Sequence, residues 1–531
     1  MNLPNGRPRI VAAKNQPTVS LGSVRITPPL LPLAVLFVLS AAMLANSMTK
    51  ELGRDEQMYC TAGALMASGQ AVYRDFSYPS QLPYHPLLLA TLYQSLGTTH
   101  YLLVGRLVSA VANILMMALI LLIFRSVFRD RRDEGLLLGL AAAVLYLFNP
   151  FVDYAAGFAW NHDVVILCVV GALWLLLTTD FQDQPRCWRA ACLGILLTVA
   201  TGMRITTVIV ELAFLVALFW MAGGTLSNRL WTVLSFLAGV VIAGVWPLWI
   251  IVRSPQAFWL NLVRIPTLYG RWLHEIGMTL DKGAMTVQAV LTPGYLILVV
   301  LAFGLGWAGF HYRQRLAPWE RQRAAVAALL PLLFLVIAYI PPTMWLQYLA
   351  VPVPFLVIAL AYPLLALGRG KPTGCTVRAE TIALSAAALL CVLANPTVLS
   401  RTISLLVPEE WEPIRLHRLS QELTRQIQEP KLVLTLGPLY AIEAGCGIYP
   451  ELSSGSIVYR IADRMTPQER RVTHTIGPAT LAEMVNERPP AGVIVGVERK
   501  RFADLEKPLR QIVPPGWDRQ DVDALEVYFR P

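Results

Sequence analysis

Several stretches of this 531-residue chain approach twenty apolar residues with almost no charge, which is the feature that most constrains its fold. As an α-helix, such a segment matches the roughly 30 Å hydrocarbon core of a bilayer. Only 15% of the residues are charged, against about 25% in an average soluble domain. The sequence therefore predicts a polytopic α-helical membrane protein. Its net charge of +10 is assigned to loops between spans and not to a nucleic-acid partner.

The apolar segments predict about eleven spans, with boundaries uncertain by several residues. The stretch 84–97 is too short to span and begins with prolines, so it is predicted to be a re-entrant or interfacial helix. Arg204 interrupts 189–222, which indicates two short helices meeting near one membrane face. The predicted spans are 30–48, 100–124, 135–151, 164–180, 189–202, 205–222, 230–252, 291–310, 324–340, 346–367 and 380–400.

Loop charge predicts the orientation, because Lys and Arg concentrate in cytoplasmic loops. Residues 1–27 read as a cytoplasmic tail, and the basic stretches "HYRQRLAPWERQR" (311–323) and "GRGKPTGCTVR" (368–378) are predicted on the same side. An odd number of spans then places the C-terminus outside. The predicted outer loops are 49–83, 152–163 and 253–290.

The composition changes after residue 405, which divides the chain into a predicted membrane domain, 28–404, and a predicted extracytoplasmic α/β domain, 405–531. Charged residues, Pro and Gly increase there, and three short runs are typical of strands: "KLVLTL" (431–436), "AGVIVGV" (491–497) and "LEVYF" (525–529). The seven cysteines show no CxxC or His-linked metal spacing and are interpreted as small core residues.

Carboxylates lie at the predicted outer membrane face. Asp55 and Glu56 follow the first span by a few residues, and Asp163 opens the span after the second outer loop. One interpretation is structural, since an acid at a helix start complements the helix dipole. The other is functional, because a carboxylate at the membrane edge is costly unless it is paired or active. A general base or a metal ligand would meet that description.

A second set of polar residues could bind a phosphate or sugar hydroxyls at the same face. For the basic members the alternative is snorkelling at the interface, and for the aromatic members an aromatic belt. Arg204 is the hardest to dismiss, since an Arg inside an apolar run needs a partner. The candidates for substrate binding are Arg74, His85, Arg204, Arg271, Gln347 and Tyr348.

The first outer loop resembles a known family. "RDEQMY" follows the first span, then "GQAVYRDFSYP" and "PYHPLLLA", and "QYLAVPVPFL" stands late in the membrane domain. Together these resemble the GT-C superfamily of membrane glycosyltransferases, in the branch of aminoarabinose transferases and protein O-mannosyltransferases. The resemblance covers most of 28–367, and "LGPLYAIEAGCGIYPELSSG" (436–455) resembles the outer domains of bacterial members.

The resemblance implies an inverting transfer of a monosaccharide from a polyprenyl-phosphate donor to a lipid, glycan or protein acceptor at the outer face of a bacterial inner membrane. Asp55 matches the first-loop acidic position of the family and is the predicted general base, with Asp163, the predicted second-loop acid, orienting the acceptor or assisting. A divalent cation between the acidic loops is possible in this superfamily, so the metal is left open. Met58, Gln81 and Leu82 replace residues typical of aminoarabinose transferases, and that particular sugar is not predicted.

Three other classes of function remain open from the residues alone. A transporter or flippase of a lipid-linked sugar would also have polar groups near an outer opening, although internal repeats are expected there and none is visible. A ligase or polymerase would use a diphosphate-linked glycan in place of a monophosphate donor. A structural membrane subunit would tolerate replacement of Asp55 and Asp163.

Overall fold

The computed structural model describes residues 30–182, 184–278, 281–369 and 379–531. Six of its helical segments are long and apolar enough to cross a membrane, and one bent pair, Ala379–Ala394 with Thr397–Leu406, adds a seventh with a 68° bend. The predicted N-terminal tail, 1–27, and most of the basic stretch 368–378 lie outside the described residues. The six are Pro32–Thr49 in α1 (Leu30–Thr49), α4 (Tyr101–Val127), α10 (Leu226–Arg253), α14 (Pro293–His311), α15 (Pro318–Tyr339) and Leu346–Gly368, which contains α16 (Pro352–Ala359) and α17 (Ala361–Gly368).

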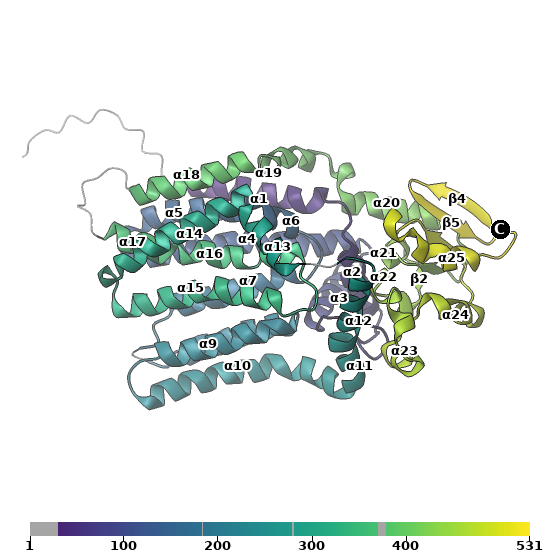
Figure 1. The fold of residues 1–531 in the computed structure, drawn as a ribbon, viewed down its shortest axis with the longest axis horizontal. Helices are drawn as coiled ribbons and strands as arrows, with labels where there is room; N and C mark the ends of the chain where they lie inside the picture. The colour runs from purple at the N-terminus through teal and green to yellow at the C-terminus, as the bar shows by residue number, and fades with distance from the viewer. Residues whose placement is uncertain (1–29, 183, 279–280, 370–378) are drawn as a thin grey trace, which may run out of the picture.

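Shorter apolar helices run alongside the long ones (Figure 1). A 17-residue helix rises about 25 Å, less than the roughly 30 Å hydrocarbon core. The prediction of about eleven spans counts these helices as spans, and it stays a prediction. They are α5 (Arg132–Leu147), α7 (His162–Thr178), α8 (Cys187–Thr201) and α9 (Val208–Met221).

The break predicted at Arg204 is present. Helix α8 ends at Thr201, Arg204 is extended, and a single 3-10 turn, Ile205–Thr207, leads into α9. The short helix predicted at 84–97 is also present as α3 (Tyr84–Leu96). Both features follow from local signals, namely a charge inside an apolar run and an apolar run too short to span.

The outer surface of the helical bundle is apolar. On α10, Val241, Ile242 and Val245 are 59–68% exposed. Water would not tolerate a surface of this kind over a whole helix, whereas lipid tails do. Inward, α8 and α10 meet at glycines: a Cβ on Gly239 would lie 2.1 Å from the Ala191 carbonyl oxygen. Small residues thus allow close helix contact within the bundle.

Short helices close one end of the bundle. They include α2 (Arg54–Ala67), which follows α1 directly, and α3. A third group comes from the predicted outer loop 253–290. It contains α11 (Pro255–Trp259), a π-helical turn (Leu260–Arg264), α12 (Ile265–Glu275) and α13 (Lys282–Leu291).

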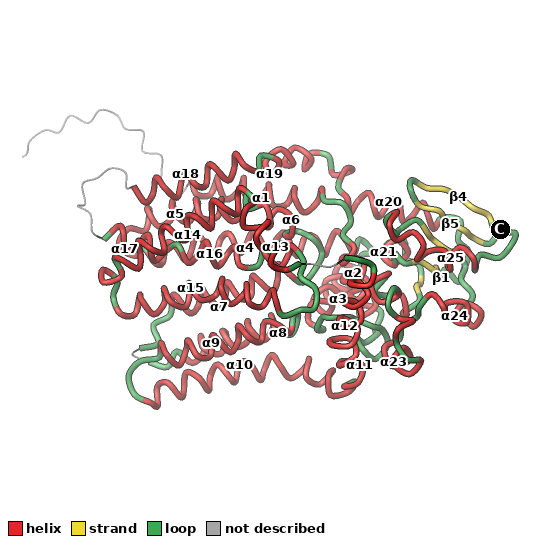
Figure 2. Tube along the Cα trace, viewed as in Figure 1, coloured by secondary structure: helices red, strands yellow, loops and turns green. Residues whose placement is uncertain are grey.

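The C-terminal part of the chain contains a five-stranded sheet at that same end of the bundle (Figures 1 and 2). The strand order is β2-β1-β3-β5-β4, with β2, β1 and β3 parallel and β5 and β4 antiparallel. The three strand-like runs correspond to β1, β3 and β5. The strands are β1 (Leu432–Thr435), β2 (Gly447–Ile448), β3 (Gly492–Val495), β4 (Asp518–Val522) and β5 (Leu525–Phe529).

Two helices of this C-terminal part, α20 (Glu412–Thr424) and α21 (Pro438–Ile442), face the bundle. The Leu439 backbone N–H donates to Oε1 of Gln57 on α2 at 2.9 Å. Leu416 and Leu439 share a buried apolar cluster with Leu102 of α4. The sheet is therefore held against the end of the bundle by both apolar and hydrogen-bonded contacts.

Candidate functional site

A cavity of about 520 Å³ lies where the bundle end, the short helices and the C-terminal part meet. Its walls come from segments that are far apart in sequence: α2, the loops after α6 (Pro150–Ala155) and α8, α12, the turn before α16, and the segment 499–502. The polar side chains lining it are Arg54, Asp55, Tyr59, Ser80, Gln81, Tyr154, Asn161, His162, Arg204, Tyr269, Thr343, Gln347, Tyr348, Arg460, Arg499 and Arg501.

Asp55 is placed in this wall by the first turn of α2. The helix begins at Arg54 because the Gly53 N–H donates to the Glu56 carboxylate at 2.7 Å, which caps the first turn. Burial, with the nearby Glu56 charge, raises the pKa of Asp55 to about 6. Among the described residues, no hydrogen bond or ion pair engages the Asp55 carboxylate. It is therefore free to accept a proton from a bound group.

Glu56 faces away from the cavity into a buried ion pair. Its carboxylate contacts the Arg106 guanidinium through two hydrogen bonds, at 2.8 and 2.9 Å, and both side chains are fully buried. It also accepts from the Ala159 N–H at 2.7 Å. Arg106 donates its remaining N–H groups to the backbone carbonyls of Ser47, Lys50 and Glu51. Such a network joins α1, α2 and α4 and has a structural role.

Arg204 and Tyr348 form another part of the cavity lining. The Arg204 guanidinium lies 4.7 Å from the centroid of the Tyr348 ring, and Gln347 lines the cavity beside them. A cation over an aromatic face is stabilised where water is scarce. The structure thus brings together four of the predicted site residues from three separate segments. They are Asp55, Arg204, Gln347 and Tyr348.

Asp163 lies behind the wall. It is 1% exposed, and its Oδ2 accepts from the Gly157 N–H at 2.8 Å. Gly157 has φ +89°, a conformation that L side chains rarely adopt, so this bond holds a special turn. The same loop continues to Trp160 and Asn161, which line the cavity. Asp163 therefore positions the loop and does not itself reach the cavity.

The other three predicted residues also lie outside the cavity wall. His85 is 1% exposed and packs edge-on against Tyr59, with ring centroids 5.2 Å apart, and burial lowers its pKa to about 3. Arg74 is exposed and pairs with Asp75 at 2.7 Å. Arg271 is exposed on α12.

Several lining residues were not among the sequence candidates. Asn161 donates to Oε1 of Gln81 at 2.6 Å and accepts from the Tyr59 hydroxyl at 3.3 Å, which ties three cavity segments together. The C-terminal part contributes Arg460, Arg499 and Arg501. No local signal marks these arginines, since only the docking of the C-terminal part onto the bundle brings them to the cavity.

The cavity is electropositive. Five arginines line it against one carboxylate, Asp55, among the residues that the structure describes. Arg54 and Arg460 share Glu498 at 3.6 and 2.6 Å, which partly neutralises that side. The balance suits a ligand that carries negative charge, such as a phosphate. With a single carboxylate in the wall, we assign no metal ligands there.

Residues 81–250 match the family model described as dolichyl-phosphate-mannose-protein mannosyltransferase. The fold is similar to that of ArnT from Cupriavidus metallidurans, solved in the apo state (15% identity, TM-score 0.59) and bound to undecaprenyl phosphate (15%, 0.57); both comparisons cover 94% of this chain and 97% of that one. An oligosaccharyltransferase of Archaeoglobus fulgidus, solved with Zn and sulfate, is similar at 10% identity and TM-score 0.50, covering 93% and 73%. No curated protein matches this chain by sequence.

The family-model match over residues 81–250 and the fold shared with ArnT confirm the resemblance to the class of GT-C membrane glycosyltransferases seen in the sequence. Within that class, the mannosyltransferase family model covers the region from Gln81 to Ile250. This region includes the loop at Asn161 and the break at Arg204, both of which line the cavity.

Proposed function

We propose that this protein transfers a monosaccharide from a polyprenyl-phosphate donor to an acceptor bound in the cavity. One observation carries the proposal: a single cavity contains both the unengaged Asp55 carboxylate and the Arg204–Tyr348 pair. The first is suited to a base and the second to a phosphate. The undecaprenyl phosphate bound to ArnT, and the dolichyl phosphate in the family description, support a polyprenyl phosphate as the carrier.

The proposed reaction needs no covalent bond between the protein and the sugar. Asp55 takes the proton from the acceptor hydroxyl as the oxygen attacks the anomeric carbon. The bond from that carbon to the phosphate oxygen breaks, and Arg204 stabilises the charge that develops on the leaving phosphate. Attack opposite the leaving group inverts the anomeric centre. A product with retained configuration would contradict this single displacement.

Apolar side chains that could contact a lipid tail lie beside Arg204, around a pocket of about 10 Å³. A small pocket shares Arg204 and Tyr348 with the cavity and is otherwise lined mainly by apolar side chains of α7, α15 and the turn before α16. An isoprenoid chain could lie against these side chains while its phosphate reaches the guanidinium. The lining includes Val165, Ile166, Phe334, Ile337, Ala338 and Val351.

The side of the membrane follows from charge. At the end of the bundle away from the cavity, the Arg129 guanidinium lies 5.4 Å from the Trp319 ring centroid, and Arg369 donates to the Arg315 carbonyl. Basic loops face the cytoplasm. We therefore infer that the cavity and the C-terminal α/β part, 405–531, are extracytoplasmic, in a bacterial inner membrane.

The C-terminal part supports acceptor binding. Arg499 and Arg501 line the cavity on the side away from the membrane. An acceptor arriving from the aqueous side meets these residues before it reaches Asp55. We infer that they contact the acceptor, whether it is a lipid headgroup, a glycan or a protein.

The deciding experiment is a transfer assay on membranes with radiolabelled polyprenyl-phosphate monosaccharides. We expect wild type to discharge one donor and Asp55→Asn to leave it intact at equal expression. The Glu51→Gln variant, which removes an exposed carboxylate of the same outer segment, is the matched control and should behave as wild type. Consumption of a diphosphate-linked glycan alone would favour the ligase. Movement of a donor across the membrane without transfer would favour the flippase.

A further inference from the structure

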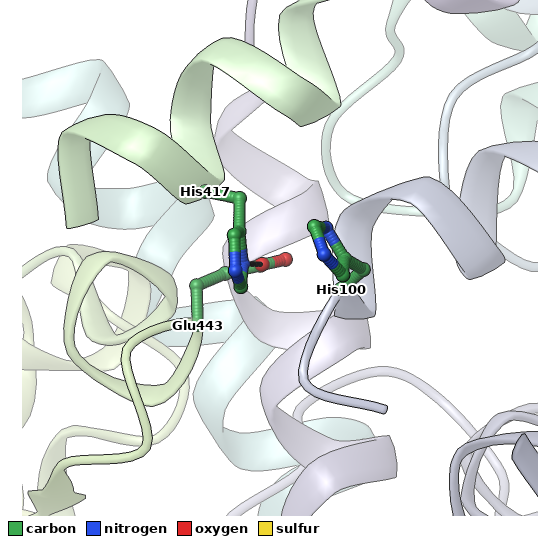
Figure 3. A group of neighbouring side chains, drawn as sticks. All are labelled: His100, His417 and Glu443. Carbon is green, nitrogen blue, oxygen red and sulfur yellow. Dashed lines mark hydrogen bonds and ion pairs between the residues drawn. The ribbon is translucent and has the colours of Figure 1, made fainter. Parts of the chain in front are cut away.

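Outside the cavity, three potential metal ligands converge between the bundle and the C-terminal part. His100 precedes α4, His417 lies on α20, and Glu443 follows α21 (Figure 3). One ligand atom from each lies within 4.8 Å of the others. Figure 3 shows the three side chains pointing toward one another. None of them lines the cavity.

One buried nitrogen of this cluster has no hydrogen-bond partner among the described residues. The Glu443 side chain is fully buried and accepts from the Leu102 N–H at 2.7 Å. Its other oxygen is 2.7 Å from Nδ1 of His417, whose Nε2 is 2.9 Å from the Gln421 amide. Nδ1 of His100 is buried and has no partner among the described residues. A buried nitrogen of this kind is costly unless something binds it.

The two imidazoles are also unusually close. Their rings stack with centroids 3.6 Å apart and an interplanar angle of 26°. At this separation one ring nitrogen from each imidazole lies within reach of a shared ion. The neighbouring Glu443 brings a buried negative charge, which a cation would neutralise.

We propose that His100, His417 and Glu443 bind one divalent transition-metal ion, for which Zn²⁺ is the best fit. Two imidazole nitrogens and one carboxylate are a known zinc ligand set, and water can complete a tetrahedron. On binding, the cation takes the place of the proton between His417 and Glu443, and that proton leaves to solvent. Binding requires one of the stacked rings to turn, because an ion lies in the plane of each imidazole that binds it, and the 2.7 Å contact between His417 and Glu443 must widen.

The proposed ion would join the C-terminal part to the membrane domain. His100 belongs to the bundle, whereas His417 and Glu443 belong to the helices that face it. Nearby, Leu439 bonds to Gln57 of α2, the helix that also carries Asp55. We infer a structural role: the ion fixes α20 and α21 on the bundle. This inference does not depend on the proposed sugar transfer.

Metal content of the full-length protein in detergent tests the proposal. After chelation, loading with ZnCl₂ and buffer exchange, we expect one zinc per chain by mass spectrometry of the metal. The His100→Asn and His417→Ala variants should retain no zinc. His311→Ala, which removes an exposed histidine at the end of α14, is the control and should keep the ion.

Thermal unfolding and Co²⁺ absorption give independent readings. Added Zn²⁺ should raise the Tm of wild type and His311→Ala but not of His100→Asn, and Co²⁺ should show intense visible d–d bands only in the first two. His100 is half-exposed, so its Asn variant is expected to fold, with monodisperse gel filtration as the check. Zinc binding by a monodisperse His100→Asn protein at the wild-type level would overturn the proposal. So would wild type that takes up no zinc.

Discussion

Asp55 and Glu56 are adjacent in the chain and have opposite surroundings. Asp55 faces the cavity with no partner among the described residues, while Glu56 lies 2.8 Å from the Arg106 guanidinium in a fully buried pair. Neighbouring positions on a helix point about 100° apart, which is enough to separate a solvent-filled cavity from a packed interior. The two adjacent acids are therefore predicted to have separate roles, and each role can be tested.

Removing the Asp55 carboxylate should abolish transfer without unfolding the protein. We expect Asp55→Asn to lower kcat/KM by about 10²- to 10⁴-fold, the usual contribution of a general base. The measurement is initial-rate transfer in detergent with the donor identified above. The Tm of the variant should equal that of wild type, because no contact of the carboxylate is lost. A variant with wild-type activity would show that Asp55 only starts a helix.

Removing the Glu56 carboxylate should instead destabilise the fold. Glu56→Ala leaves Arg106 buried and unpaired, a change that typically costs about 3–5 kcal/mol in buried pairs. We expect a clear drop in Tm by fluorescence-detected gel filtration. Glu51→Ala, which removes an exposed carboxylate of the same segment, is the control and should not shift the Tm. An unchanged Tm in Glu56→Ala would contradict the structural role.

The pH dependence of kcat/KM should show the raised pKa of Asp55. Its protonated form cannot act as a base, so kcat/KM should rise with pH up to about 6 and level off above it. An ordinary carboxyl group would place this limb near about 4. His85 does not titrate in this range, since its pKa is lowered to about 3. The exposed His274 does not line the cavity, so His274→Asn should leave the limb in place. A limb that moved in that variant would assign the titration to His274.

Substitutions of Arg204 and Arg271 test whether the donor phosphate binds in the cavity or on the exposed surface of α12. Loss of a charged contact to the leaving phosphate should lower kcat/KM by roughly 10- to 100-fold in Arg204→Ala. Tyr348→Phe keeps the ring beneath the guanidinium and should remain more active than Tyr348→Ala. Arg271→Ala is expected to match wild type in a donor-concentration series. The reverse order of effects would place the donor phosphate on α12.

Several features were predictable from sequence because their signals are local. Apolar length indicates the long helices, the charge at Arg204 indicates the break, and short runs of aliphatic, β-branched and aromatic residues indicate β1, β3 and β5. Asp55 is recognisable by its place a few residues after the first span. Each of these depends on neighbours within one or two turns of the same segment.

The tertiary structure alone decided which polar residues meet. It joined Asp55, Arg204 and Tyr348 in one cavity and directed Glu56 and Asp163 to buried partners. It also brought in the C-terminal arginines and assembled His100, His417 and Glu443 from distant segments. The composition of the chain determines that it enters a membrane, because hydrophobic transfer depends on the total apolar surface. Sites depend on contacts between remote segments, and only the packing of the helices and the docking of the sheet create those contacts.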